Sequence, residues 1–251
     1  MAITHAKAST YSDGGDSTLI LPSDWNAGHT IDGRTVNGNA PQVFAGSSGT
    51  WAPSSTKVTL AVFELQAAGG GGGGVTGLAS NCGMAAGGGS GAYAVHAVAS
   101  PGTSGYAYVI GVAGAGGAAG ANNGSSGTAT TLVTSSGTIT VPGGGGGTGS
   151  AYGTAAAAVG PGTQSLATGA NVTNTAGEAG GIAYRASGTV GFSGYGGSGI
   201  YGSGGGPLAA AGAGVAGSGY GAGGGGALTL SAVNRAGSSG QSGVMLVWEY
   251  I

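Results

Sequence analysis

The sequence predicts a mainly β protein with almost no α-helix, and three observations support this. Of the 251 residues, 64 are Gly and only 5% are charged, whereas an ordinary globular chain carries about 25% charged residues. Gly disfavours a helix by about 1 kcal/mol per position, while short apolar runs of strand length recur between the glycine tracts. Disorder normally requires low hydropathy and high net charge, yet the mean hydropathy is +0.23 and the net charge is -2. We therefore expect a packed domain.

Charge divides the chain into two parts. Residues 1–64 hold eight of the twelve charged side chains, and we expect residues 1–50 to form a separate module. Its expected features are a short strand over Thr18–Pro22, a following turn, and a small core of Ile20, Trp25 and Ile31. A core of this size stabilises little by itself, so the sequence predicts an attachment and oligomerisation module at 1–50 and a glycine-rich β domain at 51–251.

The first strand of the larger domain is expected over Val58–Leu65, where apolar side chains fall on both faces. This pattern is typical of a strand covered on both sides. Further strands are expected over Ala92–Ala99, Tyr106–Val112, Thr128–Thr134, Thr138–Val141, Gly181–Arg185, Ala227–Ala232 and Val244–Ile251. Four tyrosines on these strands are expected in the core: Tyr93, Tyr106, Tyr108 and Tyr184.

Glycine tracts separate the expected strands, at Gly69–Gly74, Gly87–Gly89, Gly143–Gly147, Gly204–Gly206 and Gly223–Gly226. Elsewhere Gly recurs at every third residue, as at Gly111, Gly114, Gly117 and Gly120. A polyproline-II helix has 3 residues per turn, so this spacing leaves one ridge without side chains and lets neighbouring helices approach closely. The alternative is a flexible linker. Because the tracts adjoin strands, the sequence favours ordered polyglycine helices of the polyproline-II type.

The residues give no indication of an enzyme. His5, His29 and His96 are scattered and Cys82 is the single cysteine, so we expect neither a metal site nor a disulfide. No nucleophile elbow or phosphate-binding loop is present, and no cofactor is expected. Five basic residues cannot neutralise a nucleic acid, no stretch reaches the ~18 apolar residues of a membrane helix, and no secretory signal is expected.

Three tyrosines lie in Gly, Ser and Ala segments and are the candidate receptor-binding residues: Tyr195, Tyr201 and Tyr220. Tyr with Ser and Gly is typical of adaptable recognition loops, and its ring and hydroxyl suit the C–H faces and hydroxyls of a sugar. The alternative is that the rings cap the glycine helices and bury their faces. The sequence leaves both interpretations open.

The order of these motifs resembles the glycine-rich domain common in bacteriophage tail-fibre proteins. The segments that carry the resemblance are Trp51–Pro53, the strand 58–65 running into Gly69–Gly74, Gly87–Ala94, Pro101–Gly117, Thr138–Gly147 and Gly243–Tyr250. The leader Leu21–Thr30 is similar to the opening of phage tail or fibre proteins. The resemblance implies an antiparallel, jelly-roll-like β-sandwich interleaved with glycine helices. Residues 155–180 are Ala/Thr-rich with few glycines and depart from this pattern, so we expect them to form an inserted surface loop.

The function that the resemblance implies is that of a virion structural protein, a tail-fibre or tail-tip adhesin that contacts the host surface. The chain would be made in the host cytoplasm and work in the virion. Low net charge favours association, so we expect a homo-oligomer, a trimer, joined to other virion proteins through residues 1–50. The expected receptor is a surface glycan or an outer-membrane protein.

Two other function classes stay open. One is a purely architectural virion fibre or decoration protein that binds no receptor. The more distant one is an ice-binding protein built from glycine helices, which would need a regular flat face of Thr or Ala. A polysaccharide-cleaving spike is disfavoured because paired carboxylates are missing.

Overall fold

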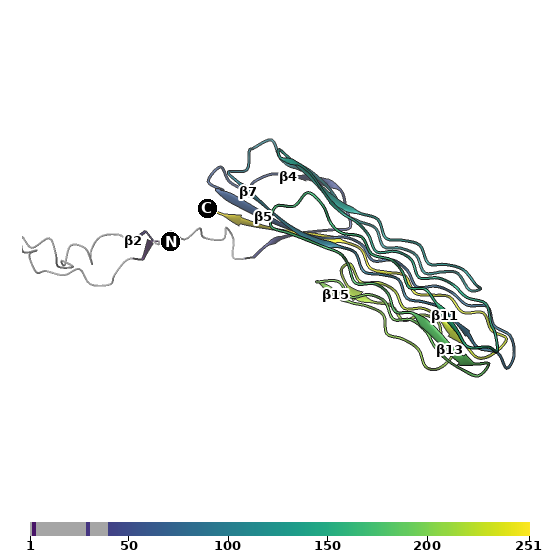
Figure 1. The fold of residues 1–251 in the computed structure, drawn as a ribbon. Helices are drawn as coiled ribbons and strands as arrows, with labels where there is room; N and C mark the ends of the chain where they lie inside the picture. Colours follow the sequence, from purple (N-terminus) through teal and green to yellow (C-terminus); the bar gives the residue numbers. More distant parts are fainter. Residues whose placement is uncertain (1, 4–28, 31–39) are drawn as a thin grey trace, which may run out of the picture.

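The computed structural model describes residues 2–3, 29–30 and 40–251, and these residues form β-strands and irregular segments but no helix. The mainly β prediction is therefore confirmed. Strand β1 (Ala2–Ile3) pairs antiparallel with β2 (His29–Thr30). From residue 40 onward the chain forms an elongated rod, with two large sheets at one end and a small three-stranded sheet at the other (Figure 1). The strand expected over Thr18–Pro22 and its small core lie outside the described residues.

Two antiparallel sheets form the end of the rod that carries the C-terminus (Figure 1). The five-stranded sheet has the order β12-β7-β5-β18-β3, with bounds Thr173–Thr175, Tyr93–Ala99, Leu60–Gln66, Val244–Tyr250 and Gln42–Ala45. The four-stranded sheet has the order β10-β9-β8-β4, with bounds Gly137–Val141, Thr130–Thr134, Tyr106–Val109 and Gly49–Trp51. Most of these strands lie within two residues of the ranges that the sequence predicts.

The two sheets share one side-chain core. Phe63 of β5 is fully buried, and its ring lies edge-on to Trp51 with a centroid distance of 4.8 Å. Tyr106 stacks on Trp51 at 5.7 Å, and Leu132 and Ile139 of the four-stranded sheet join the same cluster. The sequence predicts that both faces of β5 are covered. The inner face of β5, with Phe63, is buried, but the outer face is only half-buried, so the prediction holds for the inner face alone. The jelly-roll-like connectivity stays a prediction.

The larger domain begins before residue 51. Strand β3 pairs with the C-terminal strand β18, with Ala45 opposite Val244, and β4 begins at Gly49 and pairs with β8. The ring of Phe44 lies 5.1 Å from that of Tyr108. Residues 42–50, which the sequence analysis assigned to the N-terminal module, thus belong to the two large sheets, because Phe44 completes their common core.

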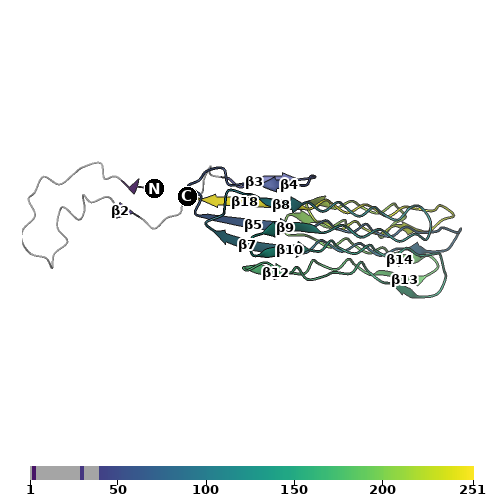
Figure 2. The ribbon, with the colours of Figure 1, turned by 90° about the horizontal axis from the view of Figure 1, so that it is seen from above.

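The middle of the rod is a bundle of glycine segments that lie side by side as wavy lines (Figure 2). At its centre lies the segment 67–75, whose amides donate hydrogen bonds to three neighbouring segments in turn, one after the other along the chain. Gly70 and Gly73 donate to carbonyls of 85–92. Gly71 and Gly74 donate to 121–128, and Gly69 and Gly72 donate to 235–243. Three other segments donate to its carbonyls: 111–120, 142–150 and 221–227. A donor direction that repeats every third residue is the period of a polyproline-II helix. The central segment therefore has six neighbours, and the prediction of ordered glycine helices is confirmed.

Glycine is required in this bundle because the backbones touch. A Cβ added at Gly71 would lie 2.1 Å from the carbonyl oxygen of Ala115, and one added at Gly72 would lie 2.1 Å from that of Gly225. Gly237 and Gly240 are three residues apart and face the same neighbour. A Cβ added at these positions would lie 2.1 and 2.3 Å from the carbonyl oxygens of Gly72 and Gly69, respectively. The glycines at every third position thus form the inward ridge that the spacing predicts.

The other end of the rod is closed by the three-stranded sheet β11-β13-β14, with bounds Ala157–Val159, Ala183–Ser187 and Val190–Phe192. One short pair, β15 (Gly202–Ser203) with β16 (Ser218–Gly219), lies part-way along the rod, near the five-stranded sheet (Figure 1). Another, β6 (Gly83–Met84) with β17 (Leu228–Thr229), accompanies the three-stranded sheet. A second, small core lies here around Cys82, Met84, Ala183 and Leu228.

Residues 155–180 are not an inserted surface loop, contrary to expectation. They contain β11 and β12, and β12 pairs with β7 at the edge of the five-stranded sheet. Between these strands, Gly162 packs into the bundle, where an added Cβ would lie 2.1 Å from the carbonyl oxygen of Gly145. Few glycines are enough here because this segment contacts the bundle on one side only.

Candidate recognition surface

The three-stranded sheet turns one face to the interior and the other to solvent. Ala183, Arg185 and Gly191 face inward and are buried. Tyr184 and Phe192 lie directly opposite each other on the outer face, and 48% and 50% of their surfaces are exposed. The prediction that Tyr184 belongs to the core is therefore wrong. Strand alternation puts Tyr184 on the face opposite Ala183, and it is the face with Ala183 that packs against the second core. Tyr106 and Tyr108 are buried as expected, and Tyr93 is half-buried.

Tyr195 extends this exposed surface along the next glycine segment. Phe192, Tyr195 and Ser198 are exposed, while the residues between them are buried, as expected for the outward ridge of a helix with 3 residues per turn. The Tyr195 ring lies against Gly181, where an added Cβ would come within 2.4 Å of ring atom Cδ1. Ile182 follows directly and is 61% exposed. We call Ile182, Tyr184, Val190, Phe192 and Tyr195 the aromatic patch.

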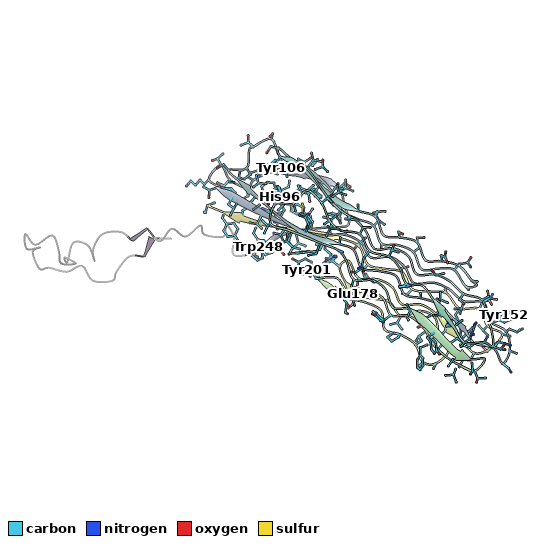
Figure 3. All side chains as sticks on the ribbon, in the orientation of Figure 1. His96, Tyr106, Tyr152, Glu178, Tyr201 and Trp248 are labelled. Atoms are coloured by element: carbon cyan, nitrogen blue, oxygen red, sulfur yellow. The ribbon has the colours of Figure 1, made fainter. Side chains whose placement is uncertain are left out.

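Tyr201 lies elsewhere, on the outer face of the five-stranded sheet. Its hydroxyl donates a hydrogen bond to the Glu64 carboxylate of β5. Tyr93 Oη and Trp248 Nε1 donate to the same carboxylate, each at 2.8 Å, and the rings of Tyr93 and Tyr201 are 6.0 Å apart. Figure 3 shows Tyr201 and Trp248 beneath this sheet. Tyr201 thereby ties the β15–β16 pair to β5.

The charges of this cluster follow from its hydrogen bonds. Burial alone would raise the pKa of Glu64, but the bonds from Tyr201, Tyr93 and Trp248 together hold that pKa below its ordinary value. Burial and the bond to Glu64 raise the pKa of Tyr93 to about 12, and the same two causes raise the pKa of Tyr201. At neutral pH the carboxylate is therefore charged and both phenols remain hydrogen-bond donors.

The three tyrosines that the sequence singles out do not form one site. Tyr195 is 45% exposed and belongs to the aromatic patch. Tyr201 is engaged with Glu64, and Tyr220 is half-buried, with its amide donating to the carbonyl of Tyr201 at 3.0 Å. Exposure fits the recognition interpretation for Tyr195, while Tyr201 binds a carboxylate on β5 and its ring lies near that of Tyr93 on β7.

The remaining reactive side chains are isolated. His96 is 2% exposed on the inner face of β7, and neither ring nitrogen has a hydrogen-bond partner. Burial lowers the pKa of His96 and raises the pKa of the Cys82 thiol. In the part of the chain that the structure describes, no group of three His, Cys, Asp or Glu side chains could hold a metal ion. In the same part, no helix is long and apolar enough to span a membrane.

The aromatic patch is the largest departure from the sequence prediction, which included only Tyr195. A usable signal was present in 183–192, where the large residues Tyr184 and Phe192 alternate with Ala183 and Gly191. The arrangement offers three aromatic rings and two aliphatic side chains on and beside a small sheet held by a second core. Neither a scan against models of known protein families nor a search of curated proteins finds a match to this chain.

Proposed function

We propose that this chain is a receptor-binding subunit of a bacteriophage tail fibre or tail tip and that it contacts the host surface through the aromatic patch. One observation carries the proposal. The patch stands at the end of the rod opposite the C-terminus (Figure 1), and its side chains are 45–61% exposed on a sheet whose other face is buried. Exposed aromatic side chains on a firm support are typical of recognition surfaces.

The chemistry of the patch fits a surface glycan. Aromatic rings pack against the C–H faces of sugars, and the tyrosine hydroxyls supply hydrogen bonds at the rim. Because Tyr184 and Phe192 are cross-strand neighbours, their positions are fixed by the sheet and little conformational entropy is lost on binding. The motif order described above supports a virion setting.

The proposal places attachment at the opposite end of the rod. Residues 1–41 precede the two large sheets, and we propose that they join the chain to other virion proteins and support a homotrimer. The free edges of β3 and β4 lie on the same flank of these sheets (Figure 2). An uncovered strand edge favours pairing with another chain, which supports oligomerisation there.

The decisive experiment compares binding of the fluorescently labelled full chain and its variants to cells of the strain on which the phage grows. The triple variant Tyr184→Ala, Phe192→Ala, Tyr195→Ala should bind at least about tenfold more weakly, because central aromatic residues dominate such interfaces. Val112→Ala is the matched control, since Val112 is 67% exposed on a different segment. Unchanged binding by the folded triple variant would instead favour a purely architectural virion protein. Gold-labelled antibody on purified particles would test the location.

Ice binding is a second candidate, favoured by one regular surface. Val112, Ala115 and Ala118 are exposed at every third position, and the adjoining segment carries Ser125 and Thr128, whose amides donate to the carbonyls of Ala115 and Val112. The result is a repeating array of small side chains. Thermal hysteresis of a solution of the purified chain tests this candidate. If an ice crystal grows as soon as the solution is cooled below its melting point, thermal hysteresis is absent and ice binding is excluded.

A further inference from the structure

The outer faces of the two large sheets differ in composition. On the four-stranded sheet, the paired strands turn threonines outward: Thr131 of β9 lies opposite Thr140 of β10, and Thr50 and Thr138 share that face. An antiparallel sheet with apolar residues inside and polar residues outside is typical of one that meets water on its outer face. The four-stranded sheet therefore shows how this chain builds a face that stays in water.

The outer face of the five-stranded sheet is apolar instead. Val43 of the edge strand β3 is 57% exposed and lies opposite Leu246 of β18. We call the outward side chains of β3, β18, β5 and β7 the apolar sheet face. Apolar residues on both faces are typical of strands that are covered on both sides, yet the single chain covers only the inner face of β5. Two rows of outward residues cross the last three of these strands: Trp248, Val62 and Ala97 in one row, and Tyr250, Leu60 and Ala99 in the other.

Most of the apolar sheet face carries no charge. Among its strand residues, Glu64 is the one charged side chain, and it lies near the end of β5 that continues into the glycine bundle. Tyr201, which comes from outside the sheet, binds the Glu64 carboxylate at that end. Two copies of the remaining face would therefore meet without bringing like charges together, and nothing on this face favours a partner that carries charge of one sign.

The two flanks of the large sheets are finished differently. On one flank, the segment 166–168 joins the two sheet edges. The Ala167 amide donates to the carbonyl of Thr175 in β12 at 3.3 Å, and Thr168 exchanges two hydrogen bonds with Thr140 of β10, at 3.0 and 2.9 Å. On the other flank, β3 and β4 are the last strands of their sheets (Figure 2). An open strand edge beside an apolar face favours association with another chain.

We propose that a second copy of this chain covers the apolar sheet face. The inference rests on the homotrimer of the proposed function and deepens it, because it assigns the surface through which the copies touch. The apolar sheet face and the open β3–β4 flank are different surfaces of one chain, and such a contact, repeated, closes into a ring.

The size of the surface fits this contact. Strands of seven residues at about 3.4 Å per residue, with about 4.8 Å between strands, give the face an outline of about 450 Å². Apolar patches of this size commonly mark interaction sites. A stable interface buries about 800 Å² per partner, so we expect the β3–β4 flank to contribute the remainder.

The first test measures the mass of the full chain in solution by sedimentation equilibrium at micromolar concentration. The unaltered chain should sediment at three times its mass of 22.8 kDa. Val62→Lys should raise the dissociation constant of the assembly at least about tenfold, because a lysine in the covered face has no counter-charge. Val133→Lys is the matched control: Val133 is 47% exposed on the outer face of the four-stranded sheet, and this variant should remain a trimer. Circular dichroism checks that both variants fold.

The second test uses a smaller change, which keeps the inference testable if Val62→Lys does not fold. Cys82 is the single cysteine and is fully buried, so a new surface thiol reports alone. Ala99 and Ala107 are both exposed in the single chain, on the outer faces of the five-stranded and four-stranded sheets. In the assembled protein, Ala99→Cys should react with a thiol reagent about tenfold more slowly than Ala107→Cys, because reaction requires access to the thiol.

The outcomes separate this surface from the proposed function. If the chain is a trimer but Val62→Lys remains one and the two thiols react at equal rates, the inference is overturned and the homotrimer proposal stands. If the unaltered chain is a monomer, both fail. If Val62→Lys dissociates the trimer while the aromatic triple variant still binds cells, the inference stands and the adhesin proposal fails.

Discussion

The two large sheets at one end of the rod and the glycine bundle in its middle are stabilised in different ways, the sheets by side chains and the bundle by the backbone. At the end formed by the two large sheets, side chains fill the interior, and Phe63, Trp51 and Tyr106 contact one another through their rings. In the glycine bundle, residues 69–74 carry no side chains, yet every one of them is buried. There the stabilisation comes from amide–carbonyl bonds between segments, most of them 2.8–3.1 Å long.

The difference predicts opposite responses to mutation. In a side-chain core the harmful change is removal of atoms, because a cavity remains. In the bundle the harmful change is addition of atoms, because a Cβ would overlap a neighbouring carbonyl. The experiments below test this contrast, from the largest expected effect to the smallest.

Phe63→Ala should lower the free energy of unfolding by about 4 kcal/mol, the usual loss for a large aromatic residue in a core. The side chain is fully buried and touches two other rings. Urea denaturation measures the change, with Val112→Ala, which should change stability by less than about 0.5 kcal/mol, as the exposed control. Equal stabilities for the two variants would show that the sheets do not depend on this core.

Gly72→Ala adds one methyl group to the centre of the bundle and should lower the free energy of unfolding by about 3 kcal/mol, the upper part of the range for overpacking. Gly160→Ala is the matched control, because an added Cβ there meets nothing within 4 Å. The control should leave the free energy of unfolding unchanged or raise it by about 0.5 kcal/mol, because Ala lowers the conformational entropy of the unfolded chain. If both alanines behaved alike in urea denaturation, the segments would not be closely packed.

Acid should weaken the two large sheets through His96. Burial lowers the folded-state pKa of His96, while the unfolded chain has the ordinary value of about 6.5. The unfolded state then binds more protons, so stability is full above about pH 6.5 and declines as the pH falls below it, by up to about 1.4 kcal/mol per pH unit. His96→Leu should remove this decline when the free energy of unfolding is compared at pH 7.5 and 5.5. An unchanged pH dependence in that variant would assign the titration to another group.

Tyr201→Phe should have the smallest of these effects, a loss of about 1 kcal/mol, because one hydrogen bond to a half-exposed carboxylate is removed. The variant should also raise the pKa of Glu64, since that bond favours the charged form. NMR titration of the Glu64 carboxyl group measures the second effect. Tyr220→Phe is the control and should leave the pKa of Glu64 unchanged.

Much of the fold follows from residue pattern alone. The short apolar run in 58–65 predicts β5, and the recurrence of Gly at 111, 114 and 117 predicts the inward ridge of an ordered helix. Both patterns are local, and each is typical of one backbone conformation. They require no knowledge of the neighbouring segments.

The pairing of segments could not be derived in the same way. A glycine segment bonds through amides and carbonyls that are the same at every position, so nothing in 69–74 specifies which six segments surround it. In β13 and β14, the alternation of Tyr184 and Phe192 with the small residues Ala183 and Gly191 indicates the exposed face, but it does not identify the segments that cover the other face. The partners of β13 come from distant parts of the chain: Ala158 of β11 lies opposite Tyr184, and Arg185 donates to the carbonyls of Ala155 and Cys82.

The side chains on the outward ridge of each peripheral glycine helix contribute little to the backbone hydrogen bonds that hold the rod together. Val112 and Tyr195 have exposed side chains, while their carbonyls accept hydrogen bonds from the amides of Thr128 and Gly181, and these bonds do not depend on the side chain. Natural variation at every third residue could therefore alter what the rod displays while leaving its scaffold intact. Under the proposed recognition function, point mutations on this ridge would be enough to change the receptor that is bound, because the scaffold folds unchanged.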